Sequence, residues 1–411
     1  QGVIVVMLNS RCHDRWLLLI TAVLIIIGSI MIYSSTSVVT PFLARKNITP
    51  FFYFKRHLFT VLMGALFMYV AFRVPAEILS KAAVPLLVFS FILLVLVFIP
   101  KIGVTAGGAR RWIRLWPSTF QPSELVKLAM VIFLARYMSM PGYRTDNVYC
   151  FLIPIAVMGL FQMVFLKQPD FGAAMSLCLL TVAMLTLSGI RLRYLMMLGV
   201  LLIPLSIKLV MEPYRMKRVL AFLDPWKDPQ GSGFQLVQSF IALGSGGIKG
   251  VGLGESKQKL SFLPESHTDF IFSLVGEELG LIGALLIVCL FLLLFCRGIS
   301  IANRTKNLFG YYLASGLSMM VALQALINFC VATGLVPTKG LPLPFISYGG
   351  SSLLMNMVAV GILLRLSKGE EVKRVIDKTE GLIERKKALM SVYGRRHALS
   401  RFGRMDGQGN S

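Results

Sequence analysis

The sequence predicts an all-α integral membrane protein, a bundle of ten transmembrane helices with one large structured loop outside the membrane. Two observations predict this fold. Of the 411 residues, 56% are hydrophobic and only 15% are charged, which is too apolar for the surface of a water-soluble domain. Apolar stretches of about 18 to 25 residues, the length that crosses a bilayer as a helix, recur along the chain. A soluble globular enzyme is therefore excluded.

Ten stretches have the length of a transmembrane helix. Nine are apolar throughout and lie at 16–36, 57–74, 82–100, 150–167, 171–190, 194–211, 270–296, 309–334 and 345–366. The tenth, 121–139, contains Glu124 and Lys127, which lie one helical turn apart on the same face and can neutralise each other inside a bundle. No small-residue cleavage site follows the first stretch, so we expect it to remain as the first transmembrane helix.

Basic residues set the expected orientation. An even number of spans places both termini on one side, and the Lys- and Arg-rich tail 369–411 assigns that side to the cytoplasm. We therefore expect a cytoplasmic segment 1–15, a ten-span domain 16–368 and a cytoplasmic tail. The net charge of +23 would suggest nucleic acid for a soluble protein. Here the basic residues lie between apolar stretches and in the tail, so we expect lipid phosphates and no nucleic acid as partners.

The connection 212–268, between the seventh and eighth spans, is predicted to be a structured extracytoplasmic loop. It contains several apolar residues, an amphipathic segment at 235–243 and a glycine cluster at 244–254, which favour short helices and tight turns over disorder. The glycine cluster lacks the Gly-Lys-Ser/Thr ending of a nucleotide-binding loop. We expect it to let the backbone turn tightly beside a lipid or another helix.

A metal or disulfide framework is not expected. The cysteines mostly lie in or beside apolar stretches and have no ligand spacing, which is typical of small buried side chains. They are Cys12, Cys150, Cys178, Cys289, Cys296 and Cys330.

Positive charges also occur on the predicted outer side. This opposes the usual bias and is tolerated more readily if the outer face holds an anionic ligand, although long loops also escape the rule. Arginine can grip phosphate oxygens bidentately, and lysine acts as a point charge. Each candidate could instead be an interfacial residue that reaches lipid headgroups. The candidate phosphate ligands are Arg110, Arg111, Arg215, Arg218 and Lys339, and Trp112 could line a sugar or lipid groove.

Asp269 is the candidate catalytic carboxylate. It opens a predicted helix, and Ser273 and Glu277 follow it on the same face, so the three form one stripe into the bundle. Helix capping is the alternative role for Asp269. Glu277 and Glu278 lie deeper, where an ionised carboxylate needs a partner, and we expect them to be structural or cavity-lining, like Glu124, Lys127 and Asp170.

Two further residues complete the set of substrate-binding candidates. His267 directly precedes Thr268 and Asp269, and holding the loop is its favoured role. Ser347 belongs to the stretch 346–352, whose serines favour close helix packing over a nucleophile because no base is evident beside them.

The order of three motifs resembles the SEDS family of shape, elongation, division and sporulation proteins. They are PESHTDFIF at 264–272, GEELG at 276–280 and ISYGGSS at 346–352, and the resemblance extends from the first span to about residue 368. The VPTKGLPLP stretch at 336–344 is similar to the cell-division branch, whereas RodA-type elongation members typically lack a lysine at the place of Lys339.

The resemblance implies a peptidoglycan glycosyltransferase in the bacterial inner membrane at the division septum. It implies an outward-facing cavity, lipid II as substrate, undecaprenyl pyrophosphate as leaving group and Asp269 as the essential aspartate on the periplasmic face. It also implies a class B penicillin-binding transpeptidase as partner, with membrane proteins of the FtsQ, FtsL and FtsB type. It allows Mg²⁺, although the sequence offers no ligand cluster.

The chemistry is consistent with a single carboxylate. A positioned carboxylate takes the proton of the attacking hydroxyl as general base, and cations stabilise the departing pyrophosphate directly. A second acid, as in glycosidases, is then unnecessary. A lipid II flippase or a non-catalytic divisome scaffold remain the alternatives; no internal repeat of the kind found in transporters is evident.

Overall fold

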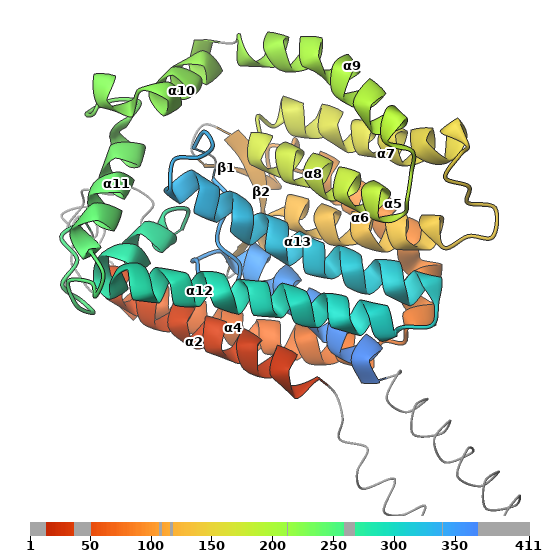
Figure 1. Cartoon of the computed structure of the whole chain (residues 1–411), viewed down its shortest axis with the longest axis horizontal. Coiled ribbons are helices and arrows are strands. Elements are labelled where there is room, and N and C mark those ends of the chain that lie inside the picture. The colour runs from red at the N-terminus through yellow and green to blue at the C-terminus, as the bar shows by residue number, and fades with distance from the viewer. Residues whose placement is uncertain are drawn as a thin grey trace, which may run out of the picture. The chain divides into compact units, whose positions relative to one another are not determined.

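Each of the ten predicted spans coincides with a helix in the computed structural model. The structure describes residues 14–36, 51–106, 109–115, 118–211, 213–258, 268–338 and 340–368, and Asp14 to Leu366 form one compact unit. The ten helices (Figure 1) are α2 Arg15–Thr36, α4 Phe51–Arg73, α5 Ala76–Leu96, α6 Pro122–Met138, α7 Val148–Lys167, α8 Phe171–Leu187, α9 Leu192–Val210, α12 Ile271–Arg304, α13 Leu308–Ala332 and the last helix, Gly350–Lys368.

Seven of the described helices are long and apolar enough to cross a membrane: α2, α4, α5, α7, α12, α13 and the last helix. The chain is therefore an integral membrane protein. Helices α6 and α8 have 17 residues each, which gives a length of about 25 Å, somewhat short of the hydrocarbon core. Helix α6 is buried on nearly all sides by α5, α8 and α13, so protein rather than lipid surrounds its charged residues.

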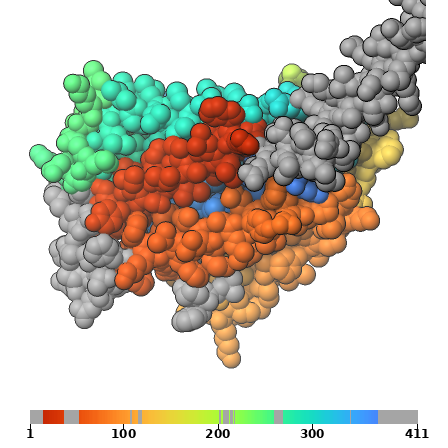
Figure 2. Space-filling model, turned by 90° about the horizontal axis from the view of Figure 1, so that it is seen from below, coloured from red at the N-terminus to blue at the C-terminus, as the bar shows by residue number. Residues whose placement is uncertain are grey.

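The lipid-facing surface follows from the exposed side chains. Helix α2 lies between α12 and α4 on the face shown in Figure 2. Large apolar side chains on these helices are exposed, among them Leu19, Ile26, Leu62, Leu66 and Leu285. An exposed apolar surface of this extent is typical of a membrane interface.

A three-stranded antiparallel sheet corrects the all-α prediction. Strands β1 Gly103–Ala106, β2 Ala109–Leu115 and β3 Ser118–Phe120 lie in the order β1-β2-β3 between α5 and α6. Ile113 pairs with Gly103 on one side and Phe120 on the other. Side chains alternate across a strand, so Ile113 is buried while Arg110 and Arg114 are exposed. The strands are too short to show in a search for apolar spans.

The predicted loop 212–268 contains the expected short helices. They are α10 Pro213–Leu223, the 3₁₀-helix η1 Pro225–Lys227 and α11 Phe234–Gly246, which includes the predicted amphipathic segment. Helix α11 packs against α12 (Figure 1).

Helix α12 is broken at Gly280, where φ is 67° and ψ is −166°. Main-chain groups of the glycine cluster form hydrogen bonds with main-chain groups of α12 on both sides of this break. The N–H groups of Val251 and Gly252 donate to the carbonyls of Glu277 and Glu278 at 3.0 and 3.1 Å, and Leu281 N–H donates to Gly247 O at 2.9 Å. A Cβ on Gly250 would stand 2.2 Å from Glu278 O, so only glycine permits this approach. The expectation that the cluster turns beside another helix is confirmed.

The last helix begins at Gly350 rather than at the predicted residue 345, because the preceding chain is non-helical. Phe345 has a φ of 64°, which is strained for a bulky side chain. This turn lies against α2 at Gly28, where a Cβ would stand 2.5 Å from Phe345 O. Irregular backbone inside a membrane protein must be buried in protein, and Leu343, Phe345 and Ile346 are buried.

Candidate active site

Asp269 lies just before α12 and its side chain is half-buried. The N-cap position of α12 belongs to Phe270, so Asp269 stands one residue outside the helix. Its main-chain carbonyl accepts a hydrogen bond from Asn328 Nδ2 at 2.8 Å. Its carboxylate lies against Gly340, where a Cβ would be 2.8 Å from Asp269 Oδ2. The chain just before α12 and the chain that follows α13 therefore meet at this carboxylate.

Side chains of α13 and of the 346–352 stretch hold the chain around Asp269. Asn328 Nδ2 also donates to Leu341 O at 2.8 Å, and Gln324 Nε2 donates to Pro342 O at 2.9 Å. Ser347 Oγ donates to the carbonyl of Thr268 at 2.5 Å and accepts from Leu343 N–H at 2.8 Å. Ser347 is buried and its hydroxyl is used within the protein, so its geometry supports a structural role.

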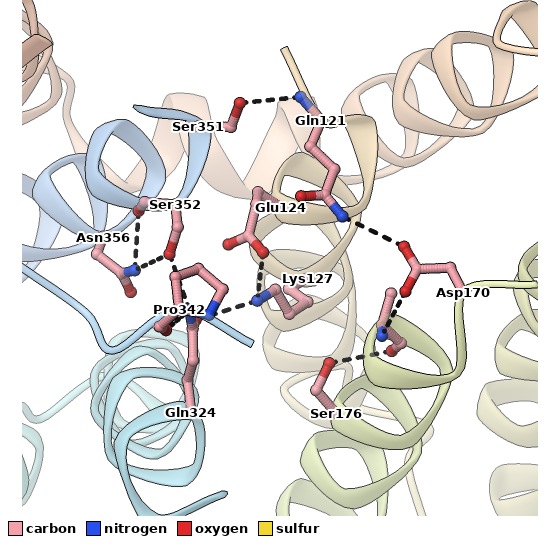
Figure 3. A network of polar contacts seen from close by, with 11 residues as sticks. Gln121, Glu124, Lys127, Asp170, Ser176, Gln324, Pro342, Ser351, Ser352 and Asn356 are labelled. Atoms are coloured by element: carbon pink, nitrogen blue, oxygen red, sulfur yellow. Dashed lines mark hydrogen bonds and ion pairs between the residues drawn. The ribbon is translucent and has the colours of Figure 1, made fainter. Parts of the chain in front are cut away.

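A buried ion pair lies beside this segment. Glu124 Oε1 and Lys127 Nζ are 2.9 Å apart, as the sequence predicted, and both residues are less than 5% exposed. Lys127 Nζ also donates to Gln324 Oε1 at 3.0 Å, and Gln324 Nε2 donates to Ser352 Oγ at 2.8 Å (Figure 3). A buried ion pair is tolerated better when its members form additional hydrogen bonds, as Lys127 does with Gln324. The network joins α6, α13 and the last helix.

Asp170 and Arg111 hold the turn between α7 and α8. Asp170 caps α8 by accepting from Ala173 N–H at 3.2 Å, and it accepts from Gln121 Nε2 at 3.2 Å (Figure 3). Arg111 donates to Pro169 O at 2.6 Å, and its Nη1 lies 3.8 Å from Asp170 Oδ1. The sequence placed Arg111 among the phosphate ligands, whereas the structure places its guanidinium on this turn.

Two candidate cations are exposed. Arg110 lies on the outward face of β2 and donates from Nε to Thr105 Oγ1 at 3.2 Å, and Trp112 follows it on the same strand, half-buried. Arg218, on α10, donates from Nη1 to Thr338 O at 3.4 Å. Thr338 is two residues before Gly340, the residue against which the Asp269 carboxylate lies. His267, Lys339 and the side chain of Arg215 lie outside the described residues.

Glu277 and Glu278 are buried and hold neighbouring segments. Glu277 accepts hydrogen bonds from the Ser256 hydroxyl and, at 3.0 Å, from Lys257 N–H. Glu278 Oε1 accepts from Ser34 Oγ of α2 at 2.6 Å. Ser273 is also buried and its hydroxyl lies 2.5 Å from Ser239 Oγ of α11. Below Asp269, the side chains of the same predicted stripe, Ser273 and Glu277, form hydrogen bonds that hold neighbouring segments.

Asn328 and Gln324 were not singled out from the sequence. A usable signal existed, because two amide side chains four residues apart in an apolar helix are expensive unless both are hydrogen-bonded. Among the described residues, no group of three or more His, Cys, Asp or Glu side chains is placed to hold a metal ion.

The fold and this site define a polytopic α-helical membrane protein whose polar residues gather around one half-buried carboxylate. Residues 15–372 match the family model described as "Cell cycle protein", which covers FtsW, RodA and SpoVE. The chain belongs to this FtsW/RodA/SpoVE family.

Curated relatives match most of the chain. A protein named "Probable peptidoglycan glycosyltransferase FtsW" from Geobacter sp. (strain M18) is 44% identical over 357 residues, 86% of this chain and 96% of its own length. One of the same name from Coxiella burnetii is 43% identical and covers 87% of this chain and 97% of its own. Stage V sporulation protein E of Bacillus subtilis is 40% identical, covering 86% and 97%.

Solved structures share the fold. A chain from a structure described as "Structural coordination of polymerization and crosslinking by a peptidoglycan synthase complex" has a TM-score of 0.71 and 28% identity, covering 88% of this chain and 99% of that one. The rod shape determining protein RodA of Thermus thermophilus has a TM-score of 0.64 and 26% identity, covering 88% and 98%.

Proposed function

We propose that this chain is a peptidoglycan glycosyltransferase that polymerises lipid II at the division septum. The relatives named as peptidoglycan glycosyltransferases support the activity, at 40–45% identity over most of the chain. The observation that carries the proposal is the placement of Asp269, a half-buried carboxylate at the start of α12 beside a segment that Arg218 also contacts.

Asp269 acts as general base in this proposal. A sugar hydroxyl of one lipid II attacks the anomeric carbon of a second glycan whose leaving group is undecaprenyl pyrophosphate. The hydroxyl proton passes to the Asp269 carboxylate while the new glycosidic C–O bond forms. The bond between the anomeric carbon and the pyrophosphate oxygen breaks, and undecaprenyl pyrophosphate leaves with its electron pair. General-base assistance contributes about 10²–10⁴-fold.

The leaving pyrophosphate is stabilised by cations. Arg110 and Arg218 are exposed and offer guanidinium groups for phosphate oxygens. Lys339, Arg215 and His267 are proposed to join them, because they neighbour Thr338, Arg218 and Thr268 in sequence. Trp112 is proposed to line the path of a sugar or lipid. Arg111 is proposed to support the site through the 169–170 turn.

Ten spans with both termini in the cytoplasm complete the proposed topology. In this topology the α5–α6, α7–α8, α9–α12 and α13–last-helix connections share the periplasmic side. Contacts between them support this: Arg111 bonds Pro169, Arg218 bonds Thr338, and Gln121 N–H donates to Ser351 Oγ at 2.9 Å. The ion pairs of Arg297, in the second half of α12, with Asp14 and of Arg191 with Asp146 lie at the side assigned to the cytoplasm.

A class B penicillin-binding transpeptidase of the FtsI type is the proposed partner. The structural match to a chain of a peptidoglycan synthase complex supports a protein that crosslinks the new strand. Membrane proteins of the FtsQ, FtsL and FtsB type are proposed to join this assembly at the septum.

Lipid II flipping is the second candidate. The break of α12 at Gly280 and the non-helical chain before Gly350 favour it, because broken helices beside a polar site occur in transporters.

The experiment uses the purified chain with its transpeptidase and fluorescent lipid II. Wild type is expected to give glycan polymer, and Asp269→Asn and Asp269→Ala are expected to lose about 10²–10⁴-fold in rate. Asp146→Asn is the matched control, because that carboxylate is exposed and pairs with Arg191 at the opposite end. Normal polymerisation by Asp269→Asn would refute the general-base assignment. A flippase would instead move labelled lipid II across liposomes and leave it unpolymerised.

A further inference from the structure

We infer that Asn328 is a positioning residue for Asp269, and this inference rests on the proposed function. Asn328 lies on α13 and is 1% exposed. Its Nδ2 donates to two main-chain carbonyls, Asp269 O and Leu341 O, both at 2.8 Å. One carboxamide therefore joins the main chain at Asp269, the candidate base, to the main chain at Leu341.

The orientation of this carboxamide is fixed by its partners. Two carbonyl acceptors require the NH₂ group to face them, because the opposite flip would place oxygen against oxygen. Asn328 Oδ1 is then left buried with no hydrogen-bond partner among the described residues. Burying an amide oxygen unsatisfied costs free energy, so the side chain is placed for what its nitrogen does rather than for packing.

The geometry connects these two bonds to the carboxylate itself. Leu341 directly follows Gly340, and Gly340 is the residue against which the Asp269 carboxylate lies. Ser347 holds the carbonyl of Thr268, so two consecutive carbonyls before α12 are fixed from the side. Asn328 thus sets the separation between the main chain of Asp269 and the surface on which its side chain rests.

Its neighbour on the helix shows what a purely structural amide does. Gln324, one turn earlier on α13, forms hydrogen bonds with Pro342 O, Lys127 and Ser352, and these three bonds do not involve Asp269. Both amides hold the same non-helical chain, but Asn328 alone also holds the residue proposed to take the proton. Misplacing a reacting group by about 1 Å can lower a rate about 100-fold without affecting ground-state binding.

The test separates positioning from stability. Asn328→Leu is nearly isosteric and removes both donors, and Asn328→Ser retains one shorter donor in case the leucine variant does not fold. Asn356→Leu is the matched control. Asn356 is also 1% exposed, its Nδ2 donates to Ser352 O at 2.8 Å, and its Oδ1 likewise has no partner among the described residues.

Polymerisation of fluorescent lipid II by the complex with its transpeptidase gives kcat and KM, and thermal unfolding in detergent gives Tm. We expect Asn328→Leu to lower kcat about 10- to 100-fold with KM within about twofold of wild type, and Asn328→Ser to lower kcat less. Asn356→Leu is expected to retain kcat even where its Tm falls as far.

Three results would overturn the inference: unchanged kcat in the variant that folds, a loss confined to KM, or an equal loss of kcat in Asn356→Leu. The Asp269→Asn experiment keeps this separate from the proposed function. If Asp269→Asn is inactive while the Asn328 variants polymerise normally, only the positioning role fails. If Asp269→Asn polymerises normally, the general base itself is wrong.

Discussion

The carboxylate of Asp269 lies against Gly340, so close that a methyl group on this glycine would press on it. A Cβ at Gly340 would stand 2.8 Å from Asp269 Oδ2 and 3.6 Å from Cγ. The atoms that an added methyl group would meet belong to the end of the Asp269 side chain and not to the main chain. We therefore expect a substitution at Gly340 to displace the carboxylate and to leave the main chain in place.

Gly340→Ala is therefore expected to lower kcat for lipid II polymerisation about 10- to 100-fold while Tm stays near that of wild type. Gly159→Ala is the control, because nothing lies within 4 Å of the position its Cβ would take. Normal polymerisation by Gly340→Ala would show that the position of this carboxylate does not limit the rate.

The stability of the protein is expected to depend strongly on whether one or both charges of the Glu124–Lys127 pair are removed. Lys127→Met leaves the Glu124 carboxylate buried without its cation, which costs about 3–5 kcal/mol in free energy of unfolding. The double variant Glu124→Gln, Lys127→Met removes both charges and is expected to recover a large part of this loss. Thermal unfolding in detergent measures both. Equal loss in the single and double variants would contradict the expectation.

Gly28→Ala is expected to destabilise the fold by about 1–3 kcal/mol, because the added methyl would meet main-chain atoms of Phe345 and Ile346 that cannot move alone. Gly199→Ala, where nothing lies within 4 Å of the added Cβ, serves as control for the glycine-to-alanine change in a helix. The comparison is made by measuring Tm for both variants. Equal Tm values would show that the main chain at 345–346 can shift to accommodate the methyl group.

Arg110 and Arg111, two of the three arginines of β2, are expected to differ in their effects. Arg111→Ala removes the bonds to the 169–170 turn and is expected to lower stability by about 1.5–3 kcal/mol, which thermal unfolding measures. Arg110→Ala leaves an exposed surface and is expected to keep Tm and raise KM for lipid II. If Arg111→Ala raised KM with Tm unchanged, its guanidinium would belong to the substrate instead.

Hydropathy was sufficient to place the helices, because a transmembrane span must satisfy its main-chain groups internally and must present apolar side chains. Even the 121–139 span, with Glu124 and Lys127 inside it, was placed, since their spacing showed that they could pair. Orientation and the number of crossings rest on charge and on contacts between connections.

Features built from main-chain hydrogen bonds could not be predicted. The sheet at 103–120, the break at Gly280 and the non-helical chain before Gly350 depend on partners far away in sequence. Asp269 was identified from its motif, but its partners Asn328 and Gly340 became visible only when α13 and the 340–347 chain were brought beside it. The contact of Arg111 with Pro169 could not be predicted for the same reason, because Pro169 lies two helices away in the sequence.

The break in α12 divides that helix into two mechanically different parts. The carbonyls of Glu277 and Glu278 accept hydrogen bonds from the N–H groups of Val251 and Gly252, so the end of this short first part is held by the glycine-rich turn of the loop. After Gly280 the helix continues as a regular, largely apolar α-helix to Arg304. A displacement of α11 and the glycine cluster would accordingly be passed through main-chain bonds to the end that carries Asp269, without requiring the second part to shift in the lipid.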